Sequence, residues 1–284
     1  MAAEGPTVQR RRLGLELKKS RERAGMTQEQ VSAHFEWHSA KVTRIETARV
    51  SVTARDVKDM LRLYGVEDQD YIEAMMALAR RSKQRTWWTD YKDIMRPGNF
   101  VGLEAEAAAV RVWEPILLPG LLQTEAYMRA LMAVGRPSDL PEEIARRVEL
   151  RIARQARLTA EDPLYLSAIV DESTLRRVVG GPKVMREQLA HLHDAMQLPN
   201  VNLQVLPFDA GEHAVMGGPA VLVELPEASG LDVVFFEGVA GEYYEEQPAE
   251  VAYYRRVFER LSASALSRNA TADLIAGVRD EIKK

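Results

Sequence analysis

The chain contains no cysteine among its 284 residues, which excludes disulfide bonds and thiolate metal sites. No apolar run reaches the ~18 residues that a membrane-spanning helix requires, so we expect no transmembrane segment. The first residues, MAAEGPTVQRRR, lack the apolar region of a secretory signal. These absences are typical of a cytoplasmic protein, and we expect that location.

The sequence also lacks the common motifs of catalytic and nucleotide-binding sites. It contains no G-x-G-x-x-G, no P-loop, no G-x-S-x-G and no H-E-x-x-H. The best cluster for a metal ion or for catalysis comprises Asp209, Glu212, His213 and Glu237. Glu212 and His213 are adjacent, however, so their side chains point apart in an extended loop. We therefore expect no catalytic residue, no metal ligand and no cofactor; an enzymatic C-terminal part remains a distant alternative.

The length of the chain fits two domains, and we place the boundary between residues 84 and 85. Residues 1–64 carry 13 Lys and Arg against 8 Asp and Glu, a net charge of +5. The remainder carries 25 against 34, a net charge of −9. A basic first part beside an acidic second part fits a first part that meets a polyanion. The excess is modest, so a merely solvated basic surface also explains it.

The stretch Thr27–Glu46, TQEQVSAHFEWHSAKVTRIE, predicts two short helices joined by a tight turn. The first helix covers about Gln28–Phe35. Thr27 is a favoured N-cap because its hydroxyl accepts a hydrogen bond from the free amides of the first turn. Gln30 stands three residues later and completes a capping box. A plain helical hairpin is the alternative interpretation of this pattern.

The second helix begins near Ser39, another favoured N-cap. Val42 and Ile45 supply its apolar face, and Glu46 is its one acid. Glu46 is expected to orient Arg49 or to close the helix. A helix that enters the major groove of DNA needs small side chains, hydrogen-bond donors and few acids. The other face of this helix has that composition: Ala40, Lys41, Thr43 and Arg44.

The segments R-x-x-A-G-M-T-Q-E-Q-V and W-H-S-A-K-V-T-R-I-E resemble the XRE-type helix-turn-helix of phage repressors and Cro-like proteins, over about residues 10–65. The resemblance implies that Gln28 contacts a phosphate and braces the recognition helix, and that Arg44 or Lys41 pairs with guanine. Trp37 is expected to pack against the domain. The DNA-binding residues implied by the match, with the loop residue after the helix, are Gln28, His38, Ser39, Ala40, Lys41, Thr43, Arg44 and Arg49.

Three further helices are expected around this motif. After a disordered segment 1–9, a helix over about Leu13–Ala24 directs Lys18, Lys19, Arg21 and Arg23 outward. Helices over about 53–63 and 68–83 follow. The N-terminal domain, residues 1–84, is thus predicted to be mainly α, with about five helices.

The remaining residues, 85–284, predict an α+β domain in which helices flank a small sheet. The predicted strands are Val110–Trp113, Leu164–Asp171, Val201–Leu206, Ala220–Leu225 and Asp232–Glu237. The predicted helices are Glu104–Arg111, Thr124–Val134, Pro141–Thr159, Glu172–Val179, Lys183–Gln197, Pro248–Ser264 and Thr271–Lys284. Residues 238–247 are expected to form a connection. The candidate wall residues of a ligand pocket, which are equally candidates for the core, are Trp87, Trp88, Trp113 and Tyr127.

This second part is similar to the C-terminal domain of a group of actinobacterial regulators of the WhiJ type, through R-T-W-W-x-x-Y, the P-G-L-L-Q-T block, D-E-S-T-L-R-R and V-N-L-Q-V-L-P. The resemblance implies an antitoxin-like or developmental regulator, such as a repressor, with a small BldB-like protein as partner. We therefore predict a transcriptional regulator that binds double-stranded DNA as a homodimer. A C-terminal domain that senses a small molecule is the alternative.

Overall fold

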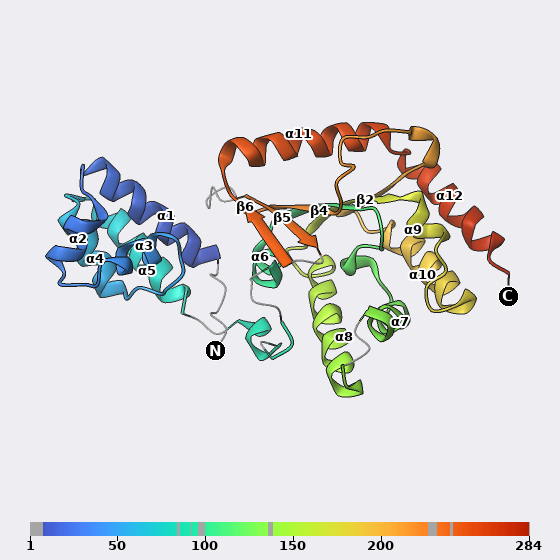
Figure 1. Cartoon of the computed structure of the whole chain (residues 1–284), viewed down its shortest axis with the longest axis horizontal. Helices are drawn as coiled ribbons and strands as arrows, with labels where there is room; N and C mark the ends of the chain where they lie inside the picture. Colours follow the sequence, from blue (N-terminus) through green and yellow to red (C-terminus); the bar gives the residue numbers. More distant parts are fainter. Residues whose placement is uncertain are drawn as a thin grey trace. The chain divides into compact units, whose positions relative to one another are not determined.

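The computed structural model describes residues 8–83, 86–91, 93–95, 100–135, 139–226, 232–238 and 241–283. The chain divides into two compact units, of which the first runs to Glu106 and the second starts at Ala107 (Figure 1). The predicted boundary between residues 84 and 85 lies outside the described residues. Within the described ranges, no helix has the length and apolar character needed to cross a membrane.

The first unit is helical, as predicted. Its elements are α1 (Val8–Arg23), α2 (Gln28–His34), α3 (Ala40–Glu46), α4 (Ala54–Leu63), α5 (Gln69–Arg81), the 3-10 helix η1 (Trp87–Tyr91) and α6 (Phe100–Glu106). The first five of these helices form the predicted N-terminal bundle (Figure 1).

Helix α1 begins earlier than predicted, at Val8. The predicted disorder of residues 1–9 is therefore wrong for the last two of them, and residues 1–7 lie outside the described ranges. The buried stripe of α1 explains the extension. Arg10 stands three residues before Leu13, on the same face, and both side chains are buried.

The N-terminal bundle closes around one apolar core, with α1 crossing the end of α3. Leu13 and Leu17 of α1 pack in this core with Val42 and Ile45 of α3. Gly14 lies at the crossing point. A Cβ atom added there would lie 2.6 Å from the carbonyl oxygen of Glu46 and 2.7 Å from that of Ile45. The absence of a side chain at Gly14 therefore allows the two helices to approach closely.

The second unit is an α+β domain, as predicted. Its strands are β1 (Ala109–Glu114), β2 (Tyr165–Asp171), β3 (Val201–Leu206), β4 (Ala220–Glu224), β5 (Val233–Gly238) and β6 (Gly241–Glu245). Its helices are η2 (Gly120–Leu122), α7 (Glu125–Gly135), α8 (Pro141–Gln155), η3 (Ala156–Leu158), α9 (Glu172–Arg176), α10 (Pro182–Ala195), η4 (Phe208–Ala210), α11 (Pro248–Ser264) and α12 (Arg268–Glu281).

The strands form one mixed sheet in the order β3-β2-β1-β4-β5-β6. Strands β1, β2 and β3 are parallel, and β4, β5 and β6 continue the sheet with antiparallel pairs. Parallel neighbours need crossover connections, and helices provide them here. Helices α7 and α8 connect β1 to β2, while α9 and α10 connect β2 to β3.

Helices cover both faces of this sheet. Figure 1 shows α11 along one face, and α7 and α8 on the other side. Trp113, Leu222 and Val234 from three strands pack in one core with Phe258 and Leu261 of α11. Alternate residues of each strand point to opposite faces, so neighbouring strand positions serve the two helical layers.

The predicted bounds of β3 and α11 are confirmed, whereas two other predictions are wrong. The predicted helix Glu104–Arg111 ends at Glu106, and β1 begins at Ala109. The helix propensity of the alanines is overridden because β1 pairs with a strand on each side. The predicted connection 238–247 contains β6, a five-residue strand that is held by pairing with β5.

The P-G-L-L-Q-T block forms a turn that side-chain amides hold in place. Gln155 donates Nε2–H bonds to the carbonyl oxygens of Gly120, at 3.1 Å, and Gln123, at 2.7 Å. Gln188 donates to the carbonyl oxygen of Leu122 at 2.7 Å. These hydrogen bonds tie α8 and α10 to the block, which therefore positions helices.

Candidate nucleic-acid interface

The capping box at the start of α2 is formed as predicted. Thr27 Oγ1 accepts a hydrogen bond from the Gln30 amide at 3.2 Å, and Gln30 Oε1 accepts one from the Thr27 amide at 2.8 Å. Helix α2 ends at His34, and the turn that follows contains Glu36 with a φ of 53°. The Thr27 cap and the Gln30 hydrogen bond back to it are therefore both formed as the sequence predicts.

Helix α3 buries Val42 and Ile45 and presents its other face to solvent. Its first turn differs from the prediction, because the Ser39 side chain makes no capping hydrogen bond. Ser39 has a helical backbone (φ −47°, ψ −37°), whereas a capping serine is extended. His38 takes the place of the cap, since its Nδ1 accepts from the Ala40 amide at 3.3 Å.

The residues predicted to bind DNA lie largely on this exposed side. Lys41 and Gln28 are half-buried. The exposed members are His38, Ser39, Ala40, Thr43, Arg44 and Arg49. Helix α3 and the two segments that flank it thus bring together six exposed side chains that are small, polar or basic.

The one acid of α3, Glu46, is turned away from this face. Its carboxylate forms a two-point ion pair with Arg21, with Nε–Oε1 at 2.6 Å and Nη2–Oε2 at 2.9 Å. The two side chains are only 9% and 2% exposed. The prediction that Arg21 points outward is therefore wrong. Of the two roles expected for Glu46, it is the last residue of α3 and so closes the helix, whereas its carboxylate pairs with Arg21 and not with Arg49. The burial of α1 against α3 selects this pair.

Gln28 extends this ion pair into a polar chain across three helices. Its Nε2 donates to Glu46 Oε2 at 2.8 Å, and its Oε1 accepts from Thr43 Oγ1 at 2.7 Å. The order Arg21–Glu46–Gln28–Thr43 joins α1, α3 and α2. Each member has a partner, so the chain fixes the angle of α3 without leaving a buried charge unpaired. The sequence analysis did not predict the Arg21–Glu46 ion pair. The one available signal was that Glu46 is the single acid in α3.

The same ion pair influences the protonation of its neighbours. The hydrogen bond to Glu46 raises the pKa of Arg21 above its ordinary value. Burial raises the pKa of Tyr64, and the negative charge of Glu46 adds to that effect. Both groups therefore keep their protons at any physiological pH.

Lys41 interacts with the turn between the two helices. Its Nζ lies 3.5 Å from the centroid of the Trp37 ring, a cation–π contact. Trp37 in turn stacks on Phe35, with ring centroids 4.7 Å apart, and both rings pack on the core of the bundle. The predicted packing of Trp37 is therefore confirmed. The ammonium group of Lys41 is held at the start of the exposed face.

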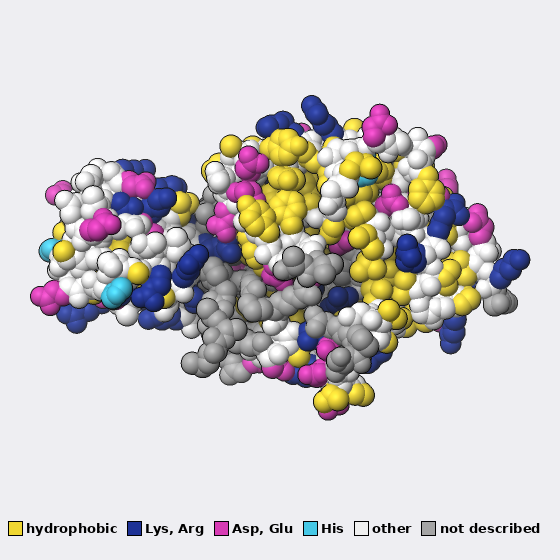
Figure 2. Space-filling model, viewed as in Figure 1, with side chains coloured by type: hydrophobic (Ala, Val, Ile, Leu, Met, Phe, Trp, Pro, Cys, Tyr) yellow, Lys and Arg dark blue, Asp and Glu magenta, His cyan; other side chains and the backbone are white. Residues whose placement is uncertain are grey.

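Other Lys and Arg side chains lie scattered over the visible face of the first unit, among Asp and Glu (Figure 2). Lys18 and Lys19 are exposed, but they lie 3.9 Å from Glu22 and 2.9 Å from Glu16 respectively. Arg44 instead contacts the carbonyl oxygen of Ala40, with its Nε at 3.4 Å. The strongest attraction for a polyanion is therefore expected at α3, where no exposed acid offsets the positive charge.

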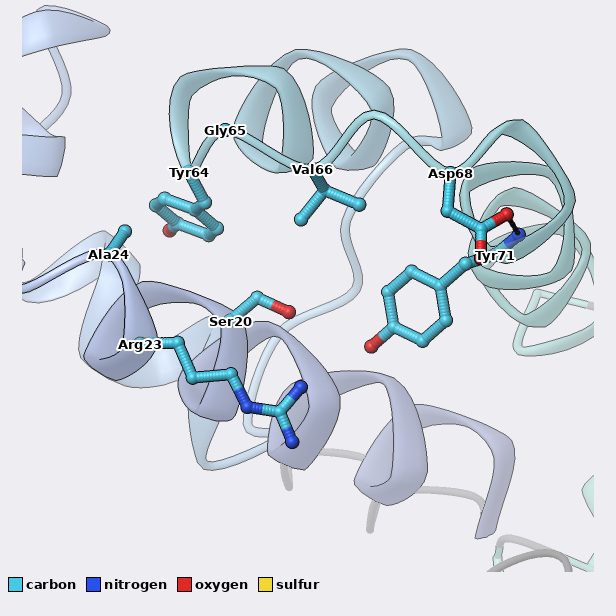
Figure 3. A pocket seen from close by; sticks show the side chains of 8 residues that line it. All are labelled: Ser20, Arg23, Ala24, Tyr64, Gly65, Val66, Asp68 and Tyr71. Atoms are coloured by element: carbon cyan, nitrogen blue, oxygen red, sulfur yellow. Dashed lines mark hydrogen bonds between the residues drawn. The ribbon is translucent and has the colours of Figure 1, made fainter.

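A hollow of about 390 Å³ lies elsewhere on the bundle, between the end of α1 and the α4–α5 connection (Figure 3). Ser20, Arg23, Tyr64 and Tyr71 contribute to its lining. Tyr71 donates its hydroxyl hydrogen to Glu16 Oε2 at 3.0 Å. The hollow is open and does not include any residue of α3, so it is separate from the candidate interface.

The four aromatic ligand candidates divide between the two units. Trp87 and Trp88 belong to the first unit and form an edge-to-face pair 5.8 Å apart. Trp113 and Tyr127 belong to the second unit and are fully buried, with 0% and 1% of their surface exposed. Trp113 packs among the strands under α11. A core position explains Trp113 and Tyr127 without any ligand.

The four residues considered for a metal ion, Asp209, Glu212, His213 and Glu237, are not arranged as a metal site. The imidazole of His213 packs edge-on against Trp113 at 4.9 Å, and its Nδ1 accepts from the Val215 amide at 3.2 Å. In the part of the chain that the structure describes, no group of three or more His, Asp or Glu side chains is arranged to hold a metal.

Comparison with protein families identifies two regions. A model described as a helix-turn-helix domain matches residues 12–75. A model described as a domain of unknown function, DUF5753, matches residues 98–277. Neither the curated proteins nor the solved structures gave a match. The first match runs from within α1 to within α5, and the second includes the whole sheet.

Proposed function

We propose that this chain, which belongs to the DUF5753 family and carries a helix-turn-helix domain ahead of that family's domain, is a sequence-specific transcriptional regulator of double-stranded DNA. One observation carries the proposal. The exposed face of α3 is small, polar and basic, because its single acid is buried against Arg21. A helix with that face meets the requirements of the major groove.

Each exposed residue has a role in this proposal. Arg44 pairs bidentately with O6 and N7 of a guanine, the commonest specific contact of arginine in the major groove. Ser39, Ala40 and Lys41 lie along the groove beside it. Thr43 and Gln28 contact the phosphate backbone while they brace each other through their 2.7 Å hydrogen bond. His38 and Arg49 contact phosphates at the two ends of α3.

The regulator is proposed to act as a homodimer. A recognition helix of seven residues contacts only a few base pairs, which is too little to select one site in a genome. Two copies that bind half-sites one helical turn apart, roughly 34 Å, double the contact. The second unit provides the additional surface that dimerisation requires.

The second unit is also proposed to bind a small protein, of the BldB-like kind that the resemblance implies. Large hydrophobic side chains exposed on that unit support a protein partner over a small-molecule ligand. Met216 is 71% exposed, Tyr243 59% and Tyr253 49%, whereas the pocket candidates Trp113 and Tyr127 are buried in the core. Exposed apolar groups that gather on one face are typical of protein interfaces.

A salt-titrated binding assay tests the DNA-binding part. The full chain is titrated onto the duplex upstream of its own gene and onto a scrambled duplex of equal length. We expect a preference for the upstream duplex that persists at ~0.15 M salt, since base contacts do not depend on counterion release. Equal binding to both duplexes that disappears with salt would show a basic patch without sequence recognition.

A further inference from the structure

The two edges of the six-stranded sheet differ in how they are protected. At the β3 edge, the α11–α12 segment occupies the backbone of the strand. The Leu266 amide donates to the carbonyl oxygen of Val205 at 2.8 Å, and Thr271 Oγ1 accepts from the Val205 amide at 3.2 Å. Arg268 donates to the carbonyl oxygen of Val201 at 3.0 Å. This edge is closed to further strands.

The opposite edge is β6. It is the last strand in the sheet, and β5 is its one strand partner among the described residues. A strand at the edge of a sheet presents a row of amide and carbonyl groups that can pair with another chain. Natural edge strands are often shielded by charged side chains, especially lysine, by proline or by a bulge. The sequence of β6, GEYYE, contains neither lysine nor proline, and its charged side chains are Glu242 and Glu245.

Aromatic rings, of which Tyr243 and Tyr253 are exposed, lie in and beside β6 on the face of the sheet that α11 covers. Phe236 of β5 contacts Tyr243 of β6 at 6.0 Å and Tyr254 of α11 at 5.1 Å between ring centroids. Tyr253 lies 5.2 Å from Tyr254. Phe236, Tyr253 and Tyr254 also line a groove of about 320 Å³ that continues to Met216. Figure 2 shows hydrophobic side chains gathered between α11 and β6.

Acidic side chains lie on both faces of β6. Glu245 Oε2 accepts from the Tyr243 hydroxyl at 2.9 Å, and Glu242 Oε2 accepts from the Tyr244 hydroxyl at 2.8 Å. The stretch 237–250 contains five Glu and no Lys or Arg. The hydrogen bond to Glu245 raises the pKa of Tyr243, so the ring stays neutral beside the carboxylate. Neutral aromatic rings next to carboxylates form a surface that attracts cations.

We infer that β6 and this aromatic–acidic surface bind an extended, Lys- or Arg-bearing segment of a protein partner, which adds a strand to the sheet. The inference rests on the proposed binding of a protein by the second unit, and it names the surface and the chemistry of the partner. Backbone pairing along β6 supplies affinity, and the Tyr243 and Tyr253 rings with Glu245 select basic side chains.

Charge disfavours the other occupants of this edge. Pairing of β6 with β6 of a second copy would place Glu242 and Glu245 of both copies along one seam with no cation between them. Like charges across a strand pair destabilise it. DNA is repelled by the same acids. A basic segment neutralises them, so charge complementarity selects it.

Fluorescence anisotropy with labelled eight-residue peptides tests the inference on the full chain. The probes are a peptide in which valine and arginine alternate, the same peptide with glutamate for arginine, and the arginine peptide with N-methylated backbone amides. We expect the arginine peptide to bind at least tenfold more tightly than either of the others. Equal binding of the arginine and glutamate peptides would overturn the inference.

Substitutions on this surface test whether the arginine peptide binds there. Tyr243→Ala and Tyr253→Ala should each reduce the affinity of the chain for the arginine peptide about tenfold. The matched control is Tyr165→Ala, because Tyr165 is a similarly exposed tyrosine (61%) in the same unit. The double variant Glu242→Lys/Glu245→Lys should reverse the preference towards the glutamate peptide. An equal effect of Tyr165→Ala and Tyr243→Ala, or no reversal, would overturn the assignment.

Two further readouts separate this inference from the proposed function. Sedimentation of the variants reports the oligomeric state, and a dimer that Tyr243→Ala dissociates would overturn the basic partner in favour of a second copy. The salt-titrated assay with the upstream and scrambled duplexes reports DNA recognition by the same samples. Absence of selective peptide binding in the wild-type chain, with its preference for the upstream duplex intact, is the failure of this inference alone. Absence of promoter preference in the wild-type chain is the failure of the regulator.

Discussion

Arg21 and Glu46, 25 residues apart in the chain, form a buried two-point ion pair that joins the first helix of the bundle to the end of α3. The pair neutralises the one acid in α3 and continues through Gln28 to Thr43. The orientation of the candidate recognition helix therefore depends on a side chain of α1.

Removing one partner of the ion pair should destabilise the bundle strongly. Glu46→Ala leaves the Arg21 guanidinium buried without its carboxylate, which costs on the order of 3–5 kcal/mol. Hydrogen exchange of the α1–α3 amides, followed by mass spectrometry, measures the local opening free energy. Lys19→Ala is the control, because its pair with Glu16 is exposed, and it should change that free energy by less than ~0.5 kcal/mol. Equal effects of the two variants would contradict a structural role for the pair.

Arg44→Ala should reduce affinity for the upstream duplex by about 1–3 kcal/mol and relax sequence preference at one base pair. Binding to a set of single-base-pair variants of the operator measures both quantities. Arg55→Ala removes an equally basic residue from α4, where the side chain is 92% exposed, and should leave the preference unchanged. A uniform loss across all duplexes would make Arg44 a phosphate contact.

Two glycine-to-alanine substitutions should have opposite signs. At Gly14 the new Cβ meets two carbonyl oxygens of α3 at 2.6 and 2.7 Å, so α1 must move and the bundle loses about 1–3 kcal/mol. At Gly277 in α12 the new Cβ has no atom within 4 Å apart from its chain neighbours and the backbone of its own helix. There the higher helix propensity of alanine should add roughly 0.5–1 kcal/mol. Thermal unfolding of both variants checks the signs. A neutral Gly14→Ala would refute the close approach of α1 and α3.

Glu114, at the end of β1, should make the stability of the second unit fall as pH rises. Burial raises the pKa of Glu114 to about 8; Glu237 adds to the rise and Arg151 opposes it. Between the ordinary carboxyl pKa and pH 8, the folded state holds a proton that the unfolded state has released, so unfolding becomes easier with increasing pH. The loss is on the order of a few kcal/mol by pH 9.

Urea unfolding of Glu114→Gln at pH 5, 7 and 9 measures this effect. The amide does not ionise, so the decline in stability between pH 5 and pH 9 should be smaller than in the wild type. Glu161→Gln is the matched control, because Glu161 is exposed on the same unit, and it should keep the wild-type decline. An unchanged pH dependence in Glu114→Gln would assign the decline to other groups.

Several features of the chain were predictable because neighbouring residues determine them. The Thr27–Gln30 capping box lies within one helical turn, and the apolar spacing of Val42 and Ile45 marks the buried side of α3. The bounds of β3 and α11 follow from apolar patterns that turn residues or proline interrupt. The sequence alone also determined the fold class and the exposed basic face of α3.

The tertiary structure decided the features that depend on distant partners. Arg21 was assigned to the surface because its helix position gives no sign of Glu46, which only the crossing of α1 and α3 brings near. Strand β6 is too short and polar to stand out, and its pairing with β5 creates it. The cap of α3 passed from Ser39 to His38 because the turn between α2 and α3 places Ser39 in a helical conformation. Caps and periodicity act within about four residues, whereas ion pairs and strand pairs form only after the chain has folded back on itself.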